Sequence, residues 1–315
     1  MTKKKRKPEG GKFKLSQKRL IAISVALSLT IALTFIIISL RSADIPFSLN
    51  AAVIDQLSRD IPNPTFVTEA TKILQSRNFN VSYYNKSLDV AFFRNLTAGN
   101  YGIILLRVHS ALRNDNSTVD LFTTEAYTSP EKYSQEIKDE LIVKGNYSFD
   151  PGHYYYAITY KFIESLQGRL PKSIVIAMGC WGLKEGCEQL ANAFIKKGAK
   201  AYIGWTDEIK SEHTDNETLK LLKMLLNYDY PLGYAISKTT TYNYTGVLPD
   251  GRKIEIKSRL RLFPDSSEVN RLKLSELIAE ANKAYTYSII NNFKTADLPF
   301  KQKDKASHLH RFIKF

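Results

Sequence analysis

Cysteine is scarce in this chain of 315 residues, which contains only Cys180 and Cys187. Two thiols cannot supply the several bridges of a disulfide scaffold, so the core must be held by packing. The five histidines and two cysteines show no paired metal-ligand spacing beyond Cys-x6-Cys and His308-x-His310, which is weak support for zinc. The sequence therefore predicts no metal site.

Glycine-rich nucleotide motifs and internal repeats are also missing. No phosphate-binding loop and no dinucleotide fingerprint occurs, so we expect no cofactor. A content of 43% hydrophobic and 11% aromatic residues excludes a disordered or fibrous chain. The length indicates one large domain or two small ones.

Acidic residues are too few to balance the basic ones, and the net charge is +14. The excess is concentrated at the two ends of the chain. Residues 1–19 carry a net charge of +8 and residues 294–315 carry +4, which leaves +2 for the remainder. A nearly neutral body does not indicate a basic binding face, so we expect no nucleic-acid partner.

Charge, proline and glycine are all absent from residues 20–40, a run of 21 residues that is long enough to span a bilayer as one helix. A cleaved signal peptide and a buried core helix are the alternatives. The basic cluster precedes the run, so the positive-inside rule places residues 1–19 in the cytoplasm. We expect a single-pass signal-anchor protein of the cell membrane, attached through residues 20–40, with its C-terminal domain outside the cytoplasm.

Seven Asn-x-Ser/Thr sequons follow the apolar run and none precedes it. Each is weak evidence alone, but together they predict a glycoprotein with an exposed outer domain. The sequon asparagines are Asn80, Asn85, Asn95, Asn116, Asn146, Asn216 and Asn243.

Unbroken apolar runs at residues 101–108, 173–178 and 199–205 are typical of buried parallel strands. Helical spacing alternates with these runs, which predicts an α/β fold of three layers around a mainly parallel sheet. A further strand is expected at residues 80–84, and a half-exposed edge strand at residues 252–263. The expected helices cover residues 65–77, 130–143, 157–167, 188–197, 215–227 and 231–240.

The predicted domain organisation follows from these patterns. In order, it comprises a basic cytoplasmic segment (1–19), the membrane helix (20–40), a proline-containing linker (41–63), the α/β domain (64–265), a C-terminal helix (266–293) and a basic tail (294–315).

Two of the apolar runs end in groups that can carry chemistry, His109 and Cys180. Ligands bind outside the carboxyl ends of parallel strands, so both side chains would emerge on one rim if the two strands are neighbours. An imidazole beside a thiol is the arrangement that a cysteine nucleophile needs. Gly179 would let the backbone approach a substrate carbonyl, so that amides from Gly179 to Trp181 could stabilise an oxyanion.

Other interpretations of these residues stay open. Cys180 can be a buried strand-end cysteine and His109 an ordinary loop histidine. In an oxidising exterior, Cys180 and Cys187 can instead close a short disulfide. Arg107, two residues before His109, is more readily the partner of a buried carboxylate than a substrate ligand.

The two strand ends, IILLRVHS and SIVIAMGCWG, resemble the caspase-fold cysteine peptidase superfamily, which includes caspases, legumains, gingipains, clostripain and bacterial CHAT domains. The resemblance implies a caspase-like sandwich with His109 as base and Cys180 as nucleophile. Ser110 stands where glycine is usual, and Met178-Gly179 replaces the usual pair before the cysteine. The spacing of 71 positions from His109 to Cys180 implies an insertion within 111–170.

Acidic pocket residues often select Arg or Lys at the cleavage site in that superfamily, which makes Asp207 and Glu208 candidates for substrate binding. Solvated loop acids are the alternative. The sequence thus predicts a membrane-anchored extracytoplasmic cysteine endopeptidase that acts on peptides or proteins. The alternative is a catalytically inactive caspase-like surface protein that binds protein or peptide partners.

Overall fold

The computed structural model describes residues 26–30, 45–147, 150, 152–247 and 252–295. The chain divides into two compact units, Met1–Asp44 and Ile45–Phe315. In the first unit only residues 26–30 are described, and they are helical; the rest of the expected membrane helix at 20–40 lies outside the described residues. Among the helices that can be described, none combines the length and apolar character needed to cross a membrane.

The second unit is built on a six-stranded sheet with the order β12-β9-β8-β3-β1-β2. All neighbouring strands run parallel except β12, which is antiparallel to β9. This arrangement confirms a mixed α/β fold with a mainly parallel central sheet. The strands are β1 (Asn50–Asp55), β2 (Asn80–Tyr84), β3 (Tyr101–Arg107), β8 (Ile174–Ala177), β9 (Ala201–Trp205) and β12 (Leu260–Phe263).

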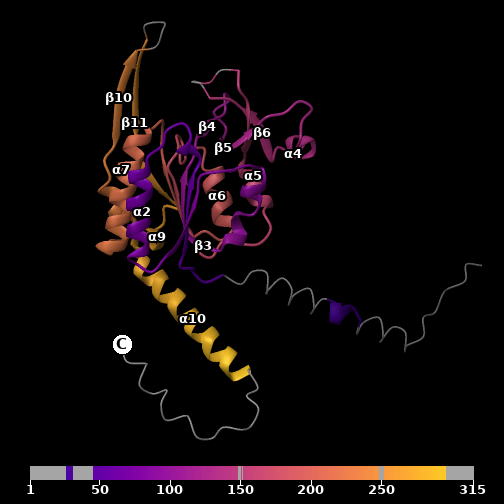
Figure 1. Ribbon diagram of the computed structural model, residues 1–315, viewed down its shortest axis with the longest axis vertical. Helices are drawn as coiled ribbons and strands as arrows, with labels where there is room; N and C mark the ends of the chain where they lie inside the picture. Colours follow the sequence, from indigo (N-terminus) through magenta and orange to yellow (C-terminus); the bar gives the residue numbers. More distant parts are fainter. Residues whose placement is uncertain (1–25, 31–44, 148–149, 151, 248–251, 296–315) are drawn as a thin grey trace, which may run out of the picture. The chain divides into compact units, whose positions relative to one another are not determined.

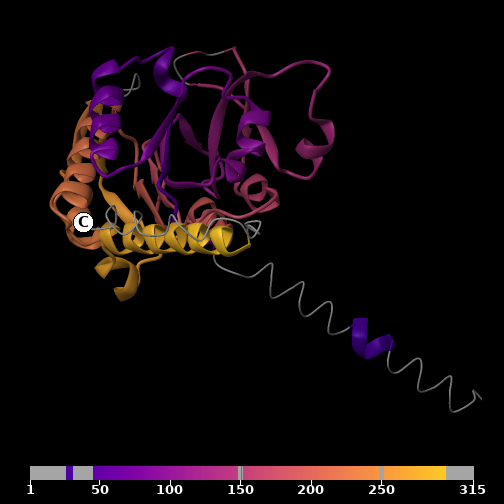
Figure 2. The same ribbon diagram turned by 60° about the horizontal axis from the view of Figure 1, so that its bottom comes forward.

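Helices cover both faces of this sheet (Figures 1 and 2). Alternate strand residues such as Val53 and Ile54 enter two separate apolar clusters, because successive side chains of a strand point to opposite faces. One face is covered by α2 (Pro64–Gln75), α7 (Ser211–Leu222), η3 (Lys223–Asn227), α8 (Leu232–Ser237), α9 (Ser267–Arg271) and α10 (Leu274–Thr295). The other is covered by α3 (Val90–Arg94), α5 (Tyr160–Ser165) and α6 (Gln189–Lys196).

The expected linker contains a central strand of the sheet. β1 pairs with both β2 and β3, and five of its six residues are buried. Its sequence, NAAVID, is short and rich in alanine, and prolines lie on either side, so it lacks the long branched-aliphatic run that marks β3. The α/β unit therefore begins near residue 45 rather than at residue 64.

A second, antiparallel sheet with the order β4-β5-β7-β6 lies largely within the expected insertion at 111–170. Its strands are β4 (Ser110–Leu112), β5 (Val119–Ala126), β6 (Ile142–Gly145) and β7 (Tyr155–Ile158). The helix expected over 130–143 shrinks to α4 (Ser134–Lys138), because Glu140 adopts a left-handed φ of 57° and Ile142 begins β6. The helix expected at 157–167 likewise starts later, after β7.

The C-terminal elements are more divided than the sequence pattern indicates. Residues 252–263 form two strands: β11 (Lys253–Ser258), which pairs with β10 (Tyr242–Val247), and the sheet-edge strand β12. The final helix breaks at Leu272, which is extended with ψ 131° and accepts a backbone hydrogen bond from Leu232 at 2.9 Å. This break separates α9 from α10.

All seven sequon asparagines are exposed. They occur on helices, strands and loops, so a common element does not explain their exposure. Each side chain is accessible as a glycan acceptor would have to be. Glycosylation itself stays a prediction.

Candidate active site at the ends of β3 and β8

His109 and Cys180 lie at the same edge of the central sheet. β3 and β8 are parallel neighbours, with Leu106 opposite Ala177 at their carboxyl ends. His109 follows this pair by three residues on one strand, and Cys180 follows it by three residues on the other. Both residues line one cavity of about 350 Å³, here called the Cys180 cavity. It lies beside β1 and β3, where the strand order reverses and open α/β sheets place their ligands.

The two loops approach closely because residue 179 is glycine. A Cβ atom at Gly179 would stand 2.3 Å from Ser110 Oγ and 2.5 Å from the Val108 carbonyl oxygen, closer than real contacts allow. The Ser110 hydroxyl also donates a hydrogen bond of 2.6 Å to the Cys180 carbonyl. Ser110 thus ties the His109 loop to the Cys180 loop.

The Cys180 thiol is half-buried and contacts the chain just before α7. Its sulfur accepts a hydrogen bond from the Ile209 amide at 3.5 Å and donates to the Ile209 carbonyl at 3.7 Å. Within the described chain, no hydrogen bond joins the sulfur to His109. Burial raises the pKa of the Cys180 thiol, and the charges of Glu208 and Asp207 raise it further. The resting group is therefore a thiol at neutral pH.

The His109 ring lies against Tyr147, with ring centroids 4.7 Å apart. The His109 amide donates to the Gln56 side-chain oxygen at 2.8 Å, and the Gln56 amide group donates to the Tyr147 hydroxyl at 2.8 Å. The pKa of His109 is lowered to about 4, mainly by burial; the Asp60 charge partly opposes this shift, and the Arg107 charge adds to it. The imidazole is thus neutral near pH 7 and can accept a proton.

Trp181 differs from the role that the sequence indicates. Its backbone amide donates to the Asp207 carbonyl at 3.0 Å, so that N–H group is not available to an oxyanion. Its φ of 53° is uncommon for a bulky residue and turns the chain sharply after Cys180. The Gly179 and Cys180 amides donate to no carbonyl in the described part of the chain, which leaves Gly179, together with the adjacent Cys180 amide, as the candidate oxyanion donor.

The two acidic candidates, Asp207 and Glu208, have different positions relative to the Cys180 cavity. Glu208 lines the Cys180 cavity, and burial together with the Asp207 charge raises the pKa of its carboxyl group. The Asp207 carboxylate instead accepts from the Trp181 indole at 3.0 Å and from the Glu208 amide at 2.8 Å, and it is not part of the cavity lining. Glu208 can therefore contact a ligand, whereas Asp207 shapes the loop.

Cys187 does not pair with Cys180, because both cysteines are free thiols. Cys187 is only 4% exposed, and its sulfur donates to the Asn116 carbonyl at 3.2 Å. The disulfide alternative is therefore not formed in this structure, and Cys187 acts as a packing residue beneath the loop after β4.

A buried ionic network supports the His109 side of the cavity. Arg107 is fully buried and pairs with Asp55 at the end of β1 and with Asp215 on α7, which confirms it as the partner of buried carboxylates. Asn63, the N-cap of α2, also donates to Asp215 at 2.9 Å. No local sequence motif marks Asp55 or Asp215 as partners of Arg107. The apolar residues around Arg107 indicate only that its charge is buried and needs a partner.

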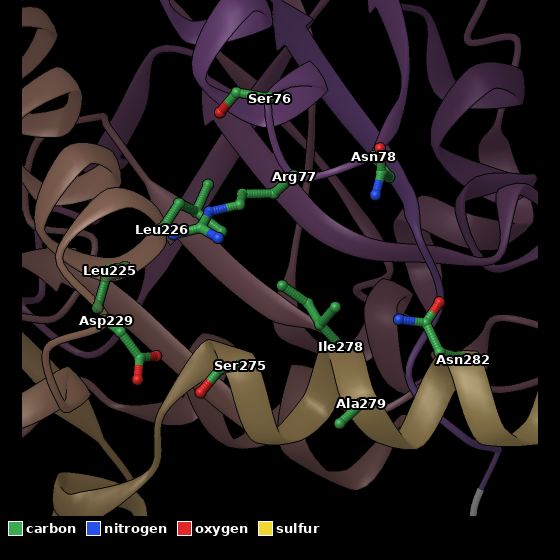
Figure 3. A pocket seen from close by; sticks show the side chains of 10 residues that line it. All are labelled: Ser76, Arg77, Asn78, Leu225, Leu226, Asp229, Ser275, Ile278, Ala279 and Asn282. Carbon is green, nitrogen blue, oxygen red and sulfur yellow. The ribbon is translucent and has the colours of Figure 1, made fainter. Parts of the chain in front are cut away.

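A larger cavity of about 430 Å³ lies between the C-terminal end of α2, η3 and α10 (Figure 3). The Arg77 side chain extends toward Leu226 there, and Ile278 of α10 projects from the opposite wall. Among the described residues that line it there is no cysteine or histidine. Reactive groups are thus gathered at the Cys180 cavity rather than here.

No family model matches this chain, and no curated protein matches it.

Proposed function

We propose that the protein is a membrane-anchored extracytoplasmic cysteine endopeptidase of the caspase-like superfamily. One observation carries the proposal: His109 and Cys180, from the ends of adjacent parallel strands, line a single cavity together with Glu208. Further support comes from the motifs at those strand ends, and the apolar run at 20–40 supports the anchor.

In the proposed reaction a peptide carbonyl enters the cavity between the thiol and the imidazole. Cys180 transfers its proton to neutral His109 as the sulfur attacks the carbonyl carbon, and the Gly179 amide donates to the developing oxyanion. His109 then protonates the leaving amine as the C–N bond breaks. Water, deprotonated by His109, hydrolyses the thioester and regenerates the thiol.

Glu208 gives the proposed site a preference for basic substrates. Its carboxylate lines the wall next to Cys180, where it can pair with a Lys or Arg side chain that precedes the scissile bond. The same charge would repel an acidic side chain. Peptides with Arg or Lys at that position are therefore the expected substrates.

The experiment measures peptide hydrolysis by the full-length protein in detergent with a reductant. The substrates are fluorogenic peptides that carry Arg, Lys or Asp before the scissile bond. Cys180→Ala and His109→Ala should each lower kcat/KM at least about a thousandfold. Cys187→Ala is the matched control, since it removes a thiol from the same segment, and it should retain activity. Hydrolysis that survives Cys180→Ala and His109→Ala would overturn the dyad.

The second candidate is an inactive surface protein of the same fold that binds peptides. It is favoured by one contact, the engagement of the Cys180 sulfur by Ile209 rather than by His109. An absence of turnover by the wild-type chain, together with saturable peptide binding that Glu208→Gln weakens, would support this candidate.

A further inference from the structure

The β10–β11 hairpin has two chemically different faces. Its register places Tyr242 opposite Ser258, Tyr244 opposite Ile256, and Gly246 opposite Ile254. Because side chains alternate along strands, these residues share one face, and Asn243, Thr245, Lys253, Glu255 and Lys257 share the other. The hairpin extends beyond the end of α7 in Figure 1.

The first face, here called the apolar hairpin face, comprises Tyr242, Tyr244, Gly246, Ile254 and Ile256. Tyr244 is 40% exposed and both isoleucines are only half-buried. A two-stranded hairpin is marginally stable by itself, and an antiparallel sheet normally packs its apolar face against something. Asn243, Thr245, Lys253, Glu255 and Lys257 on the polar face are all exposed, and Asn243 is a sequon asparagine, so a glycan there would leave the apolar side accessible.

Aromatic rings continue along the apolar hairpin face. The rings of Tyr242 and Tyr244 are nearly parallel, with an interplanar angle of 3° and centroids 6.5 Å apart. The Tyr244 ring lies over Gly246, where an added Cβ atom would stand 2.7 Å from a ring carbon. The Lys210 ammonium lies over the Tyr244 ring, 5.2 Å from its centroid. The face is thus an ordered apolar strip.

The strip begins beside the Cys180 cavity. Tyr242 packs on His213 at 5.2 Å, and His213 packs on the buried Trp205 at 5.4 Å. At the same end of the hairpin, the Ser258 hydroxyl accepts from the Asp207 amide at 3.0 Å and donates to its carbonyl at 3.1 Å. Asp207 directly precedes Glu208 of the cavity wall, so the base of the hairpin is fixed to that wall.

Electrostatics agree with this placement. Burial raises the pKa of the Tyr242 hydroxyl, and the nearby Tyr244, Glu208 and Cys180 raise it further. Glu208 and Cys180 belong to the cavity lining, so Tyr242 is close enough to both to sense their charge.

We infer that the apolar hairpin face docks an extended, apolar segment of a polypeptide substrate and directs that polypeptide to Cys180. The inference rests on the proposed peptidase function and names its substrate as unfolded or extended protein. Because the strip begins beside the Cys180 cavity, a polypeptide bound along the strip would be the same chain that reaches the thiol. Six residues of strand span about 20 Å, which corresponds to about six residues of extended peptide with apolar side chains at alternate positions.

The test uses the full-length chain and two substrates that share a cleavage sequence, a short fluorogenic peptide and a long unfolded protein such as casein. The double variant Ile254→Thr with Ile256→Thr keeps the β-branched shape but removes apolar surface. We expect KM for casein to rise at least about fivefold with kcat unchanged, and kinetics on the short peptide to stay within about twofold. The matched control, Lys253→Thr with Lys257→Thr on the polar face, should change neither.

A binding measurement keeps this inference separate from the proposed chemistry. In a Cys180→Ala background, labelled casein should bind with a Kd that the isoleucine substitutions weaken at least about fivefold, whether or not the wild type turns over. The inference would be overturned if the isoleucine substitutions impaired both substrates equally, or if they did not weaken casein binding. It would also be overturned if they abolished binding to anionic vesicles while casein binding persisted. Unchanged thermal unfolding midpoints confirm folding, and if the double variant unfolds, Tyr244→Ser, at the exposed ring, is measured instead with the same expectations.

Discussion

Arg107 and Asp215 form a bidentate ion pair in the interior, with Nε donating to Oδ1 at 2.8 Å and Nη2 donating to Oδ2 at 2.9 Å. A third bond of 2.7 Å joins Nη1 of Arg107 to Asp55. One buried cation thus serves two buried carboxylates, from α7 and from the end of β1. This network ties α7 to the two strands on which the His109 side of the Cys180 cavity is built.

Arg107→Met should therefore lower the free energy of unfolding by about 3 to 5 kcal/mol, because Asp55 and Asp215 would be left buried without a counter-charge. Urea denaturation followed by tryptophan fluorescence measures the change. Lys161→Met, which breaks the exposed pair with Glu140, provides the comparison and should cost less than about 1 kcal/mol. Similar losses in the two variants would show that the Arg107 network contributes no more than a surface pair.

Gly179→Ala should reduce both stability and the reactivity of Cys180. The new methyl group would overlap Ser110 Oγ and the Val108 carbonyl, so the ends of β3 and β8 must separate. Overpacking of this kind costs about 1 to 3 kcal/mol. Gly182→Ala in the same loop is the control, because its nearest neighbour, the Ala177 Cβ, would lie 3.3 Å away. Thermal unfolding and the rate of Cys180 alkylation are measured for both, and the Gly179 variant should lose more in each.

Long apolar runs allowed β3, β8 and β9 to be predicted from sequence, since a strand buried on both faces needs apolar residues at every position. β1 was not predicted from the sequence, because its buried alanines do not form the long run of large apolar residues that marks the other central strands. The meeting of His109 and Cys180 in one cavity follows from where parallel strands end. By contrast, the contact of Cys180 with Ile209 and the bond from the Trp181 amide to Asp207 depend on the path of the chain between β9 and α7, which no local pattern encodes.

Alkylation of Cys180 by iodoacetamide should still accelerate as the pH rises through 9. The pKa of the thiol is raised above its ordinary value of 9.0 by burial and by the Glu208 and Asp207 charges, and only the thiolate reacts. Glu208→Gln removes one of those charges, so it should shift the profile toward lower pH. Mass spectrometry of the Cys180 peptide gives the rates, in a Cys187→Ala background. A profile that levels off below pH 8, or that moves upward in Glu208→Gln, would contradict this account.

Acid should destabilise the fold through His109. Its pKa is about 4 in the folded chain, mainly because burial disfavours the charged ring, while an unfolded histidine titrates near 6.5. The unfolded state thus binds the proton more readily, and the stability contributed by the neutral ring is complete above about pH 6.5 and declines as the pH falls toward 4. Over that interval the loss from this group reaches about 3 kcal/mol, as expected for a shift of this size. His109→Gln cannot titrate and should flatten the decline. Urea unfolding curves measured at half-unit intervals from pH 4 to 7 distinguish the two chains, and parallel declines in both of them would place the acid sensitivity elsewhere.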